Sequence, residues 1–183
     1  MTNTDRSTEG LQRLIDKDAI SDCIMRYSRG IDRRDRAVLE SAYWPEAVDN
    51  HLSFKGPVGD FIDFAFKFSN GMRTHHMLGN ILIDFSSPEE AHTETYYIAA
   101  HERETPDGQQ DFIIHGRYLD LFEKRGNEWR ILERTLTCDL YSMRPNTSDW
   151  QNGMYSKIDT IGAYIPDDPL YRFLKRTLRD ATS

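Results

Sequence analysis

Two side chains in this sequence form the smallest set that can move a proton at neutral pH. Asp32 ends an amphipathic helical stretch at residues 27–32, and His76 begins residues 76–80 in a strand-like segment. A carboxylate beside an imidazole can orient the ring and stabilise its cationic form. One group at the end of a helix and the other on a sheet can face each other across a cavity. The pair therefore predicts an acid/base enzyme.

The spacing of these residues alone leaves a second interpretation open. Asp32 could cap the helix or form an ion pair near Arg33 and Arg34, and His76 could be an ordinary histidine of a sheet. His51, His92 and His115 have no partner that the sequence shows, and we expect them on the surface or in the sheet.

The N-terminal part of the chain has the spacing of helices. Thr8 or a neighbour can cap a first helix, Asp35 can cap a short second helix that continues through Tyr43 and stops at Pro45, and residues 61–68 form an apolar third one. The first helix carries a stripe near the 3.6-residue period: Leu11, Leu14, Ile15, Ile20, Cys23, Ile24, Tyr27 and Ile31. We expect the side of the helix that carries this stripe to be buried.

The second half of the chain has the pattern of strands. A short strand is expected at 48–54, and four long antiparallel strands at 74–85, 91–103, 110–125 and 128–141, separated by turns. Alternation along the first long strand places His76, Leu78 and Leu82 on one face and His75 and Ile83 on the other, unless a bulge exchanges them. The order of elements predicts an α+β fold, in which a curved antiparallel sheet wraps around three N-terminal helices to form a cone with an internal cavity.

Length and composition limit the classes of protein to consider. The 183 residues suit one domain at 10–142, with a flexible N-terminus at 1–9 and an extension at 143–183 that packs on the domain or on a neighbouring subunit. A net charge of -7 disfavours binding to nucleic acid or to an anionic membrane. With only Cys23 and Cys138 and no apolar run of membrane-spanning length, we expect a cytoplasmic protein without disulfides.

The joint order of these elements resembles the SnoaL-like branch of the nuclear transport factor 2-like superfamily. The resemblance covers about residues 10–142 and rests on residues 27–32, residues 76–80 and the hairpin at 116–131. It implies a cone-shaped fold around a deep apolar cavity, assembled into a homodimer or homotrimer. Scytalone dehydratase, bile acid 7α-dehydratase and hexachlorocyclohexane dehydrochlorinase are similar enzymes of this superfamily, and all of them eliminate a small group without a cofactor.

The resemblance also implies roles for four residues. His76 would abstract a proton next to an activating group while Asp32 holds its other ring nitrogen, and Tyr27 would donate a hydrogen bond to a substrate oxygen. His101 falls where scytalone dehydratase has its second histidine and is expected to be the general acid. Gly116 and Tyr118 replace a polar pair of scytalone dehydratase, so the substrate stays open.

Aromatic residues suggest the walls of a binding cavity. A cavity of this kind favours a hydrophobic, aromatic or polycyclic ligand, and Arg134 either enters it to meet an anionic group or lies outside the sheet. The candidate substrate-binding residues are Tyr43, Trp44, Phe64, Tyr118, Arg134 and Trp150. No HxH, HxxxH or HExxH spacing is present, so we expect neither a metal nor another cofactor.

The sequence thus predicts a cofactor-independent lyase that removes a proton and expels a small group from a hydrophobic, ring-bearing substrate. Water is the expected leaving group, and loss of formaldehyde from a lignin-derived aromatic diol by a retro-aldol-like route is the second version. Two alternatives are an isomerase or cyclase of the ketosteroid isomerase or polyketide cyclase type, and a non-catalytic binding or assembly module.

Overall fold

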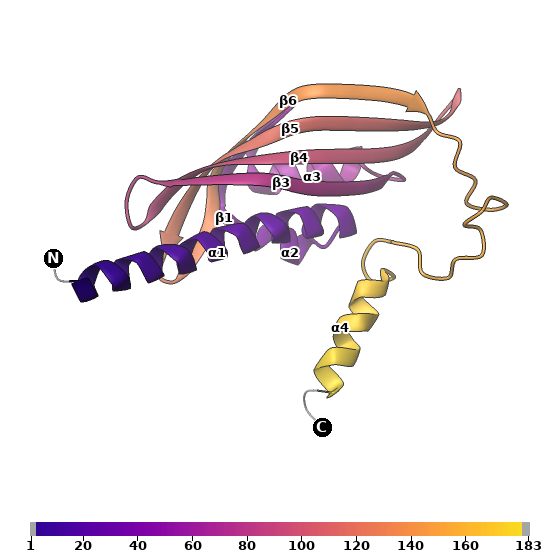
Figure 1. Ribbon diagram of the computed structural model, residues 1–183. Coiled ribbons are helices and arrows are strands. Elements are labelled where there is room, and N and C mark those ends of the chain that lie inside the picture. Colours follow the sequence, from indigo (N-terminus) through magenta and orange to yellow (C-terminus); the bar gives the residue numbers. More distant parts are fainter. Residues whose placement is uncertain (1–2, 181–183) are drawn as a thin grey trace.

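The computed structural model describes residues 3–180, and it is a curved six-stranded sheet that packs against helices on one face (Figure 1). The strands lie in the order β2-β1-β6-β5-β4-β3. The elements are α1 (Asn3–Arg33), α2 (Arg36–Glu40), β1 (Tyr43–His51), β2 (Phe54–Pro57), α3 (Val58–Phe68), β3 (Arg73–Phe85), β4 (Glu90–Thr105), β5 (Gly108–Arg125), β6 (Glu128–Pro145) and α4 (Pro169–Asp180). The predicted α+β fold with a curved sheet is confirmed.

Helix α1 is buried only along its C-terminal half. Ile20, Ile24 and Tyr27 are fully buried, whereas Leu11 and Leu14 near the other end of the predicted stripe are exposed. The helix begins at Asn3, inside the segment that was expected to be flexible. The helix thus meets the sheet from Asp16, which bonds Lys124 and Trp129, to the end that carries Asp32.

The turn after α1 leads the chain directly into α2. Arg34 has a positive φ of 52°, and Asp35 caps α2 as predicted by accepting a hydrogen bond from the Val38 N–H at 3.2 Å. Helix α2 then crosses α1 so closely that a Cβ on Gly30 would lie 2.6 Å from the backbone nitrogen of Leu39. A glycine is therefore needed at position 30 for α2 to pack here.

The segment after α2 differs from the sequence prediction. The helix ends at Glu40, and Tyr43 and Pro45 belong to β1 rather than to the helix. Strand β1 runs parallel to β6, with an irregularity between Tyr43 and Val48 that accommodates the proline, which cannot donate a ladder hydrogen bond. This pairing of distant segments has no local signal in the sequence.

The four long strands are antiparallel as predicted, but β3 contains a bulge. Leu78 pairs with Tyr97 and Ile81 pairs with Thr95, so three steps along β3 match two along β4. After the bulge the buried face changes from the one that carries His76 to the one that carries Ile83, and Leu82 is exposed. The assignment of Leu82 to the face of His76 was therefore wrong, because the extra residue reverses the alternation.

The chain after β6 returns to the end of α1. The N–H of Ile165 donates to the carbonyl of Arg33 at 2.8 Å, and the Arg33 guanidinium lies 3.3 Å from Asp168. The hydroxyl of Tyr171, in α4, donates to Asp35 at 2.7 Å. We refer to residues 146–168 as the C-terminal strap (Figure 1). No helix in the described part of the chain is both long and apolar enough to cross a membrane.

Candidate active site

Asp32 and His76 are in direct contact, although one lies on α1 and the other on β3. The Nδ1 atom of His76 is 2.7 Å from Oδ1 of Asp32, and the backbone N–H of His76 donates to Oδ2 at 2.8 Å. The hydroxyl of Thr74 donates to Oδ1 at 2.9 Å. Both side chains are only 7% exposed. Arg33 and Arg34 bond elsewhere, to the C-terminal strap and to the end of α3, so they do not pair with Asp32.

These hydrogen bonds determine the charge of the aspartate. Burial alone would raise the pKa of Asp32, but the hydrogen bonds and the positive charge that His76 can carry outweigh it and lower the pKa below its ordinary value, with a further contribution from Thr74. Asp32 is then a carboxylate that only accepts hydrogen bonds. Nδ1 of His76 must carry a hydrogen, so Nε2 of the neutral ring is left with a free lone pair. His76 is arranged as a base.

His76 lines an inner cavity of about 210 Å³ between α1, α3 and the concave face of the sheet. The walls are formed by Tyr27, Ile31, His51, Leu52, Ser53, Phe61, Phe64, Ala65, Phe68, Ser69, Thr74, His76, Tyr97, Ala99, His101, Phe112, Ile114 and Leu136. None of these described residues is a lysine, arginine, aspartate or glutamate. The cavity suits an uncharged ring.

His101 lies beside His76, with the two ring centres 5.7 Å apart in an edge-to-face arrangement. Burial, followed by repulsion from the charge on His76, lowers the pKa of His101 to about 4. Its Nδ1 is 3.3 Å from the carbonyl oxygen of Phe112, which can only accept, so Nδ1 carries the hydrogen and Nε2 is an acceptor. The geometry therefore disfavours His101 as the general acid that was expected and favours it as an acceptor for a substrate hydroxyl.

Tyr27 lines the inner cavity one helical turn before Asp32. It is fully buried, and the polar side chain that its hydroxyl meets is the guanidinium of Arg134. Burial raises the pKa of Tyr27, so the phenol stays neutral. A guanidinium only donates, so it leaves the hydrogen of the hydroxyl free for an acceptor, which is consistent with the predicted donor to a substrate oxygen.

Arg134 neither enters the cavity nor lies outside the sheet, in contrast to both expectations. It is 1% exposed and makes two hydrogen bonds of 2.7 Å to Asp120, its neighbour across β5 and β6. Its guanidinium lies between the rings of Tyr27 and Tyr118, at 4.0 and 4.1 Å from their centres. The buried carboxylate holds the arginine in the core, behind the cavity wall.

The other candidate binding residues lie in three different places. Phe64 lines the inner cavity as expected. Tyr43 is buried and donates to Asp49, and Trp44 donates to the carbonyl of Glu123, so neither reaches the cavity. Tyr118 stacks on Tyr97 from behind, with the ring centres 4.3 Å apart. Trp150 lies on the C-terminal strap, outside the inner cavity.

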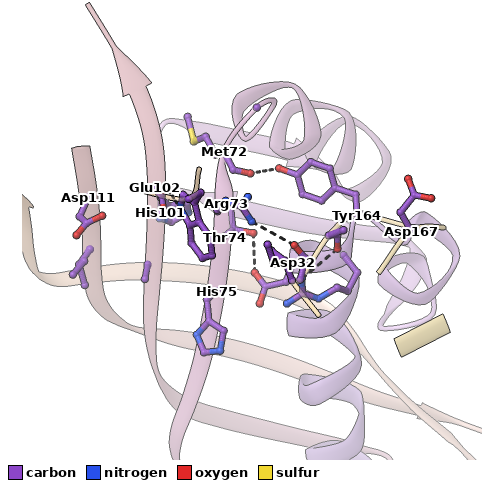
Figure 2. A pocket seen from close by; sticks show the side chains of 18 residues that line it. Asp32, Met72, Arg73, Thr74, His75, His101, Glu102, Asp111, Tyr164 and Asp167 are labelled. Atoms are coloured by element: carbon purple, nitrogen blue, oxygen red, sulfur yellow. Dashed lines mark hydrogen bonds between the residues drawn. The ribbon is translucent and has the colours of Figure 1, made fainter. Parts of the chain in front are cut away.

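Trp150 belongs to an outer pocket of about 770 Å³ between the strap and the ends of β3, β4 and β5 (Figure 2). Its Nε1 donates to Glu102 at 2.9 Å, and Arg73 lies over its ring. Thr74 and His101 line both spaces, and Asp32 borders the outer one. The outer pocket is thus adjacent to the Asp32–His76 pair and can hold the part of a ligand that the inner cavity cannot.

The sequence analysis missed His51, which lines the inner cavity at the end of β1. Its Nδ1 lies 3.4 Å from Oδ1 of Asp49, a fully buried carboxylate. The signal that could have found it is the spacing of two residues between Asp49 and His51, which places both side chains on the same face of a strand. In the described part of the chain, no cluster of three or more His, Cys, Asp or Glu residues is arranged to hold a metal ion.

Comparison with known families identifies the class of this protein. The SnoaL-like domain family matches residues 12–135, about two thirds of the sequence. The chain belongs to this family, within the nuclear transport factor 2-like superfamily, as the sequence resemblance predicted. A comparison with curated protein sequences gives no match.

Solved structures agree with this assignment at the level of the fold. A putative scytalone dehydratase from Novosphingobium aromaticivorans is 24% identical, with a TM-score of 0.63 over 72% of this chain and 89% of its own. A type 2 hexachlorocyclohexane dehydrochlorinase is 22% identical, with a TM-score of 0.68 over 79% and 99%. A Nostoc punctiforme protein of unknown function with a cystatin-like fold is 15% identical, with a TM-score of 0.54 over 68% and 91%. All three are less than 25% identical to this chain, so they show the shared fold alone.

Proposed function

We propose that this protein is a cofactor-independent lyase that eliminates water from a neutral, ring-bearing substrate with a hydroxyl group beta to a carbonyl. The observation that carries the proposal is the 2.7 Å contact between Asp32 and Nδ1 of His76 at the wall of the inner cavity. A base fixed in this tautomer and facing an apolar space is the requirement for removing a proton next to a carbonyl.

The proposed reaction has one base and one departing group. Nε2 of His76 takes the proton from the carbon beside the carbonyl, and the imidazolium that forms is stabilised by Asp32. The electrons of the broken C–H bond form the new carbon–carbon double bond as the C–O bond breaks, and the hydroxyl leaves as water after it gains a proton. Tyr27 donates a hydrogen bond to the carbonyl oxygen, where negative charge develops.

The two spaces suggest the shape of the substrate. The phenylalanines on α3 and Phe112 on β5 surround the inner cavity, which has room for about one ring, and the outer pocket begins at Thr74 and His101. The absence of lysine and arginine from the described lining of the inner cavity favours an uncharged group there. An aromatic ketone with a larger substituent toward the outer pocket fits both spaces.

The experiment uses β-hydroxypropiophenone, a single-ring β-hydroxy ketone, with the purified protein and no added metal or cofactor. Dehydration gives phenyl vinyl ketone and water, and both liquid chromatography and the ultraviolet absorbance of the product detect it. We expect turnover that is lost in His76→Ala. Turnover by His76→Ala at the wild-type rate, or no conversion of the ketone by the wild-type protein, would refute the proposal.

The same compound separates dehydration from retro-aldol cleavage, isomerisation and simple binding. If His76 instead removes the hydroxyl proton, the carbon–carbon bond breaks and the products are formaldehyde and acetophenone, as in the retro-aldol version. An isomerase would give a product of unchanged mass, and a binding module would leave the compound unaltered. Mass spectrometry of the products, with chromatography to resolve an isomer, therefore distinguishes these four outcomes.

A further inference from the structure

A second pair of a carboxylate and an imidazole, Asp49 and His51 on β1, lies at the inner cavity, where His51 lines the wall and Asp49 is buried behind it. The first pair uses β3, the edge strand at the opposite side of the sheet order. Because the sheet is curved, both His51 and His76 line the same inner cavity. Two imidazoles from different walls can thus contact one ligand.

The contacts of Asp49 leave one of its oxygens free for His51. Oδ2 accepts a hydrogen bond of 2.7 Å from the hydroxyl of Tyr43, so Asp49 acts as an acceptor in a fully buried position. Oδ1 and Nδ1 of His51 are 3.4 Å apart without forming a hydrogen bond, and neither atom has any hydrogen-bond partner among the described residues. Contacts of catalytic groups are often this long in the absence of a ligand and become shorter when it binds.

Packing determines the orientation of the His51 ring. The ring lies against that of Phe61, with the centres 4.7 Å apart and the planes inclined by 32°. The two nitrogens of an imidazole lie on opposite edges of the ring, so an Nδ1 that faces Asp49 leaves Nε2 for the cavity. The side chain is 18% exposed, which gives that edge access to a ligand.

Elimination of water requires an acid as well as a base, because hydroxide is a poor leaving group. His76 is used as the base, and His101 presents an unprotonated Nε2. Tyr27 is a buried neutral phenol, which donates a hydrogen bond but releases a proton with difficulty. His51 is the remaining cavity histidine, and its ring lies beside the carboxylate of Asp49.

We propose that His51 is the general acid of the reaction and that Asp49 is the residue that positions it. The inference rests on the proposed function. In the imidazolium form of His51, Nδ1–H faces Asp49 and Nε2–H faces the substrate hydroxyl. As the C–O bond breaks, the Nε2 proton passes to the departing oxygen, which leaves as water, while His76 receives the proton from carbon. Exchange of protons with solvent returns both histidines to their starting forms.

The test compares two substrates that differ only in whether the departing group needs a proton. β-Hydroxypropiophenone loses water and β-chloropropiophenone loses chloride, and both give phenyl vinyl ketone. We expect His51→Gln to lower kcat/KM for the hydroxy compound by about 100-fold or more and to change the rate for the chloro compound by only a few-fold. His76→Ala should lose activity on both compounds.

Each outcome has a separate meaning. Equal losses on both compounds in His51→Gln, or a loss on neither, would overturn the role of His51 while leaving His76 as the base. Full activity of His76→Ala would instead overturn the proposed function. Conversion of the chloro compound by His51→Gln also shows that this variant is folded.

The role of Asp49 has a readout that needs no turnover. NMR of the histidine ring nitrogens should show a protonated Nδ1 in His51 of the wild-type protein, and Asp49→Asn should change this signal, whereas Asp35→Asn, at a carboxylate outside the inner cavity, should not. An unprotonated Nδ1 in the wild type, or a signal unaffected by Asp49→Asn, would overturn the pairing.

Discussion

Replacing Asp32 by asparagine should reverse the tautomer of His76 without removing any atom from the site. The carboxylate accepts from three donors: the Thr74 hydroxyl and Nδ1–H of His76 at one oxygen, and the backbone N–H of His76 at the other. An asparagine has only one oxygen to offer. Its amide nitrogen must therefore face one side of this arrangement.

The energies decide which side the amide nitrogen faces. If it faced the backbone N–H of His76, two donors would meet and leave a buried polar group unsatisfied, at a cost of about 1–3 kcal/mol. If it faces Nδ1, the ring proton moves to Nε2 and Nδ1 becomes the acceptor, while the Thr74 hydroxyl can rotate to accept as well. The second arrangement is favoured, and in it Nε2 has no lone pair to take a proton. We expect kcat to fall by about 100- to 10,000-fold.

The assay is conversion of β-hydroxypropiophenone, with Asp35→Asn as the matched control. Asp35 is a nearby carboxylate that caps α2 and accepts from the Tyr171 hydroxyl. Asparagine is an equally good N-cap, and its amide nitrogen can donate to the Tyr171 oxygen, which can also accept, so this variant should keep activity and stability close to wild type. Ring-nitrogen NMR of Asp32→Asn should show a protonated Nε2 in His76. Activity of Asp32→Asn within a few-fold of wild type, or an unchanged tautomer, would refute the reasoning.

Three further predictions concern stability, each measured by urea unfolding. Arg134→Met should lower the free energy of unfolding by about 3–5 kcal/mol because it leaves Asp120 buried without its partner. Adding Asp120→Leu should restore most of the lost stability. A loss below about 1 kcal/mol in Arg134→Met alone would contradict the prediction. His101 binds a proton near pH 6.5 in the unfolded protein but only near pH 4 in the folded protein. The free energy of unfolding of the wild-type protein should therefore fall by up to about 3 kcal/mol as the pH falls through this window. His101→Gln should make the free energy of unfolding less dependent on pH over the same window. An unchanged slope in that variant argues against a buried neutral ring. Gly30→Ala should lower the free energy of unfolding by more than about 1 kcal/mol, because the Cβ of the alanine would meet the backbone of Leu39. A variant as stable as the wild-type protein would show that α2 shifts freely.

Much of the site was predictable because its residues carry local signals. Helical spacing ends at Asp32, and strand alternation separates His75 from His76, so a carboxylate at the end of a helix and one histidine of a sheet could be chosen in advance. The α+β order followed from the change in period between the helices and the long strands. These features depend on neighbours within a few positions in the chain.

Other features depend on pairings between distant segments. The parallel pairing of β1 with β6 sets Asp49 opposite Arg134. The bulge in β3 reverses which residues face the core beyond Leu78. Arg134 is buried because Asp120 lies opposite it across the hairpin. The alternation of residues along each strand cannot distinguish such a buried pair from an exposed one.

The sequence by itself thus determined the types of element and their order, because periodicity, capping and turn residues act over short distances. The choice of Asp32 and His76 as a pair followed from the resemblance to the SnoaL-like family, because their spacing alone left another interpretation open. Only the tertiary structure decided that His51 shares their cavity and that Arg134 does not. The physical reason is that the curvature of the sheet and the register of its strands are set by contacts across the whole fold, and these determine which polar side chains meet in the same enclosed space.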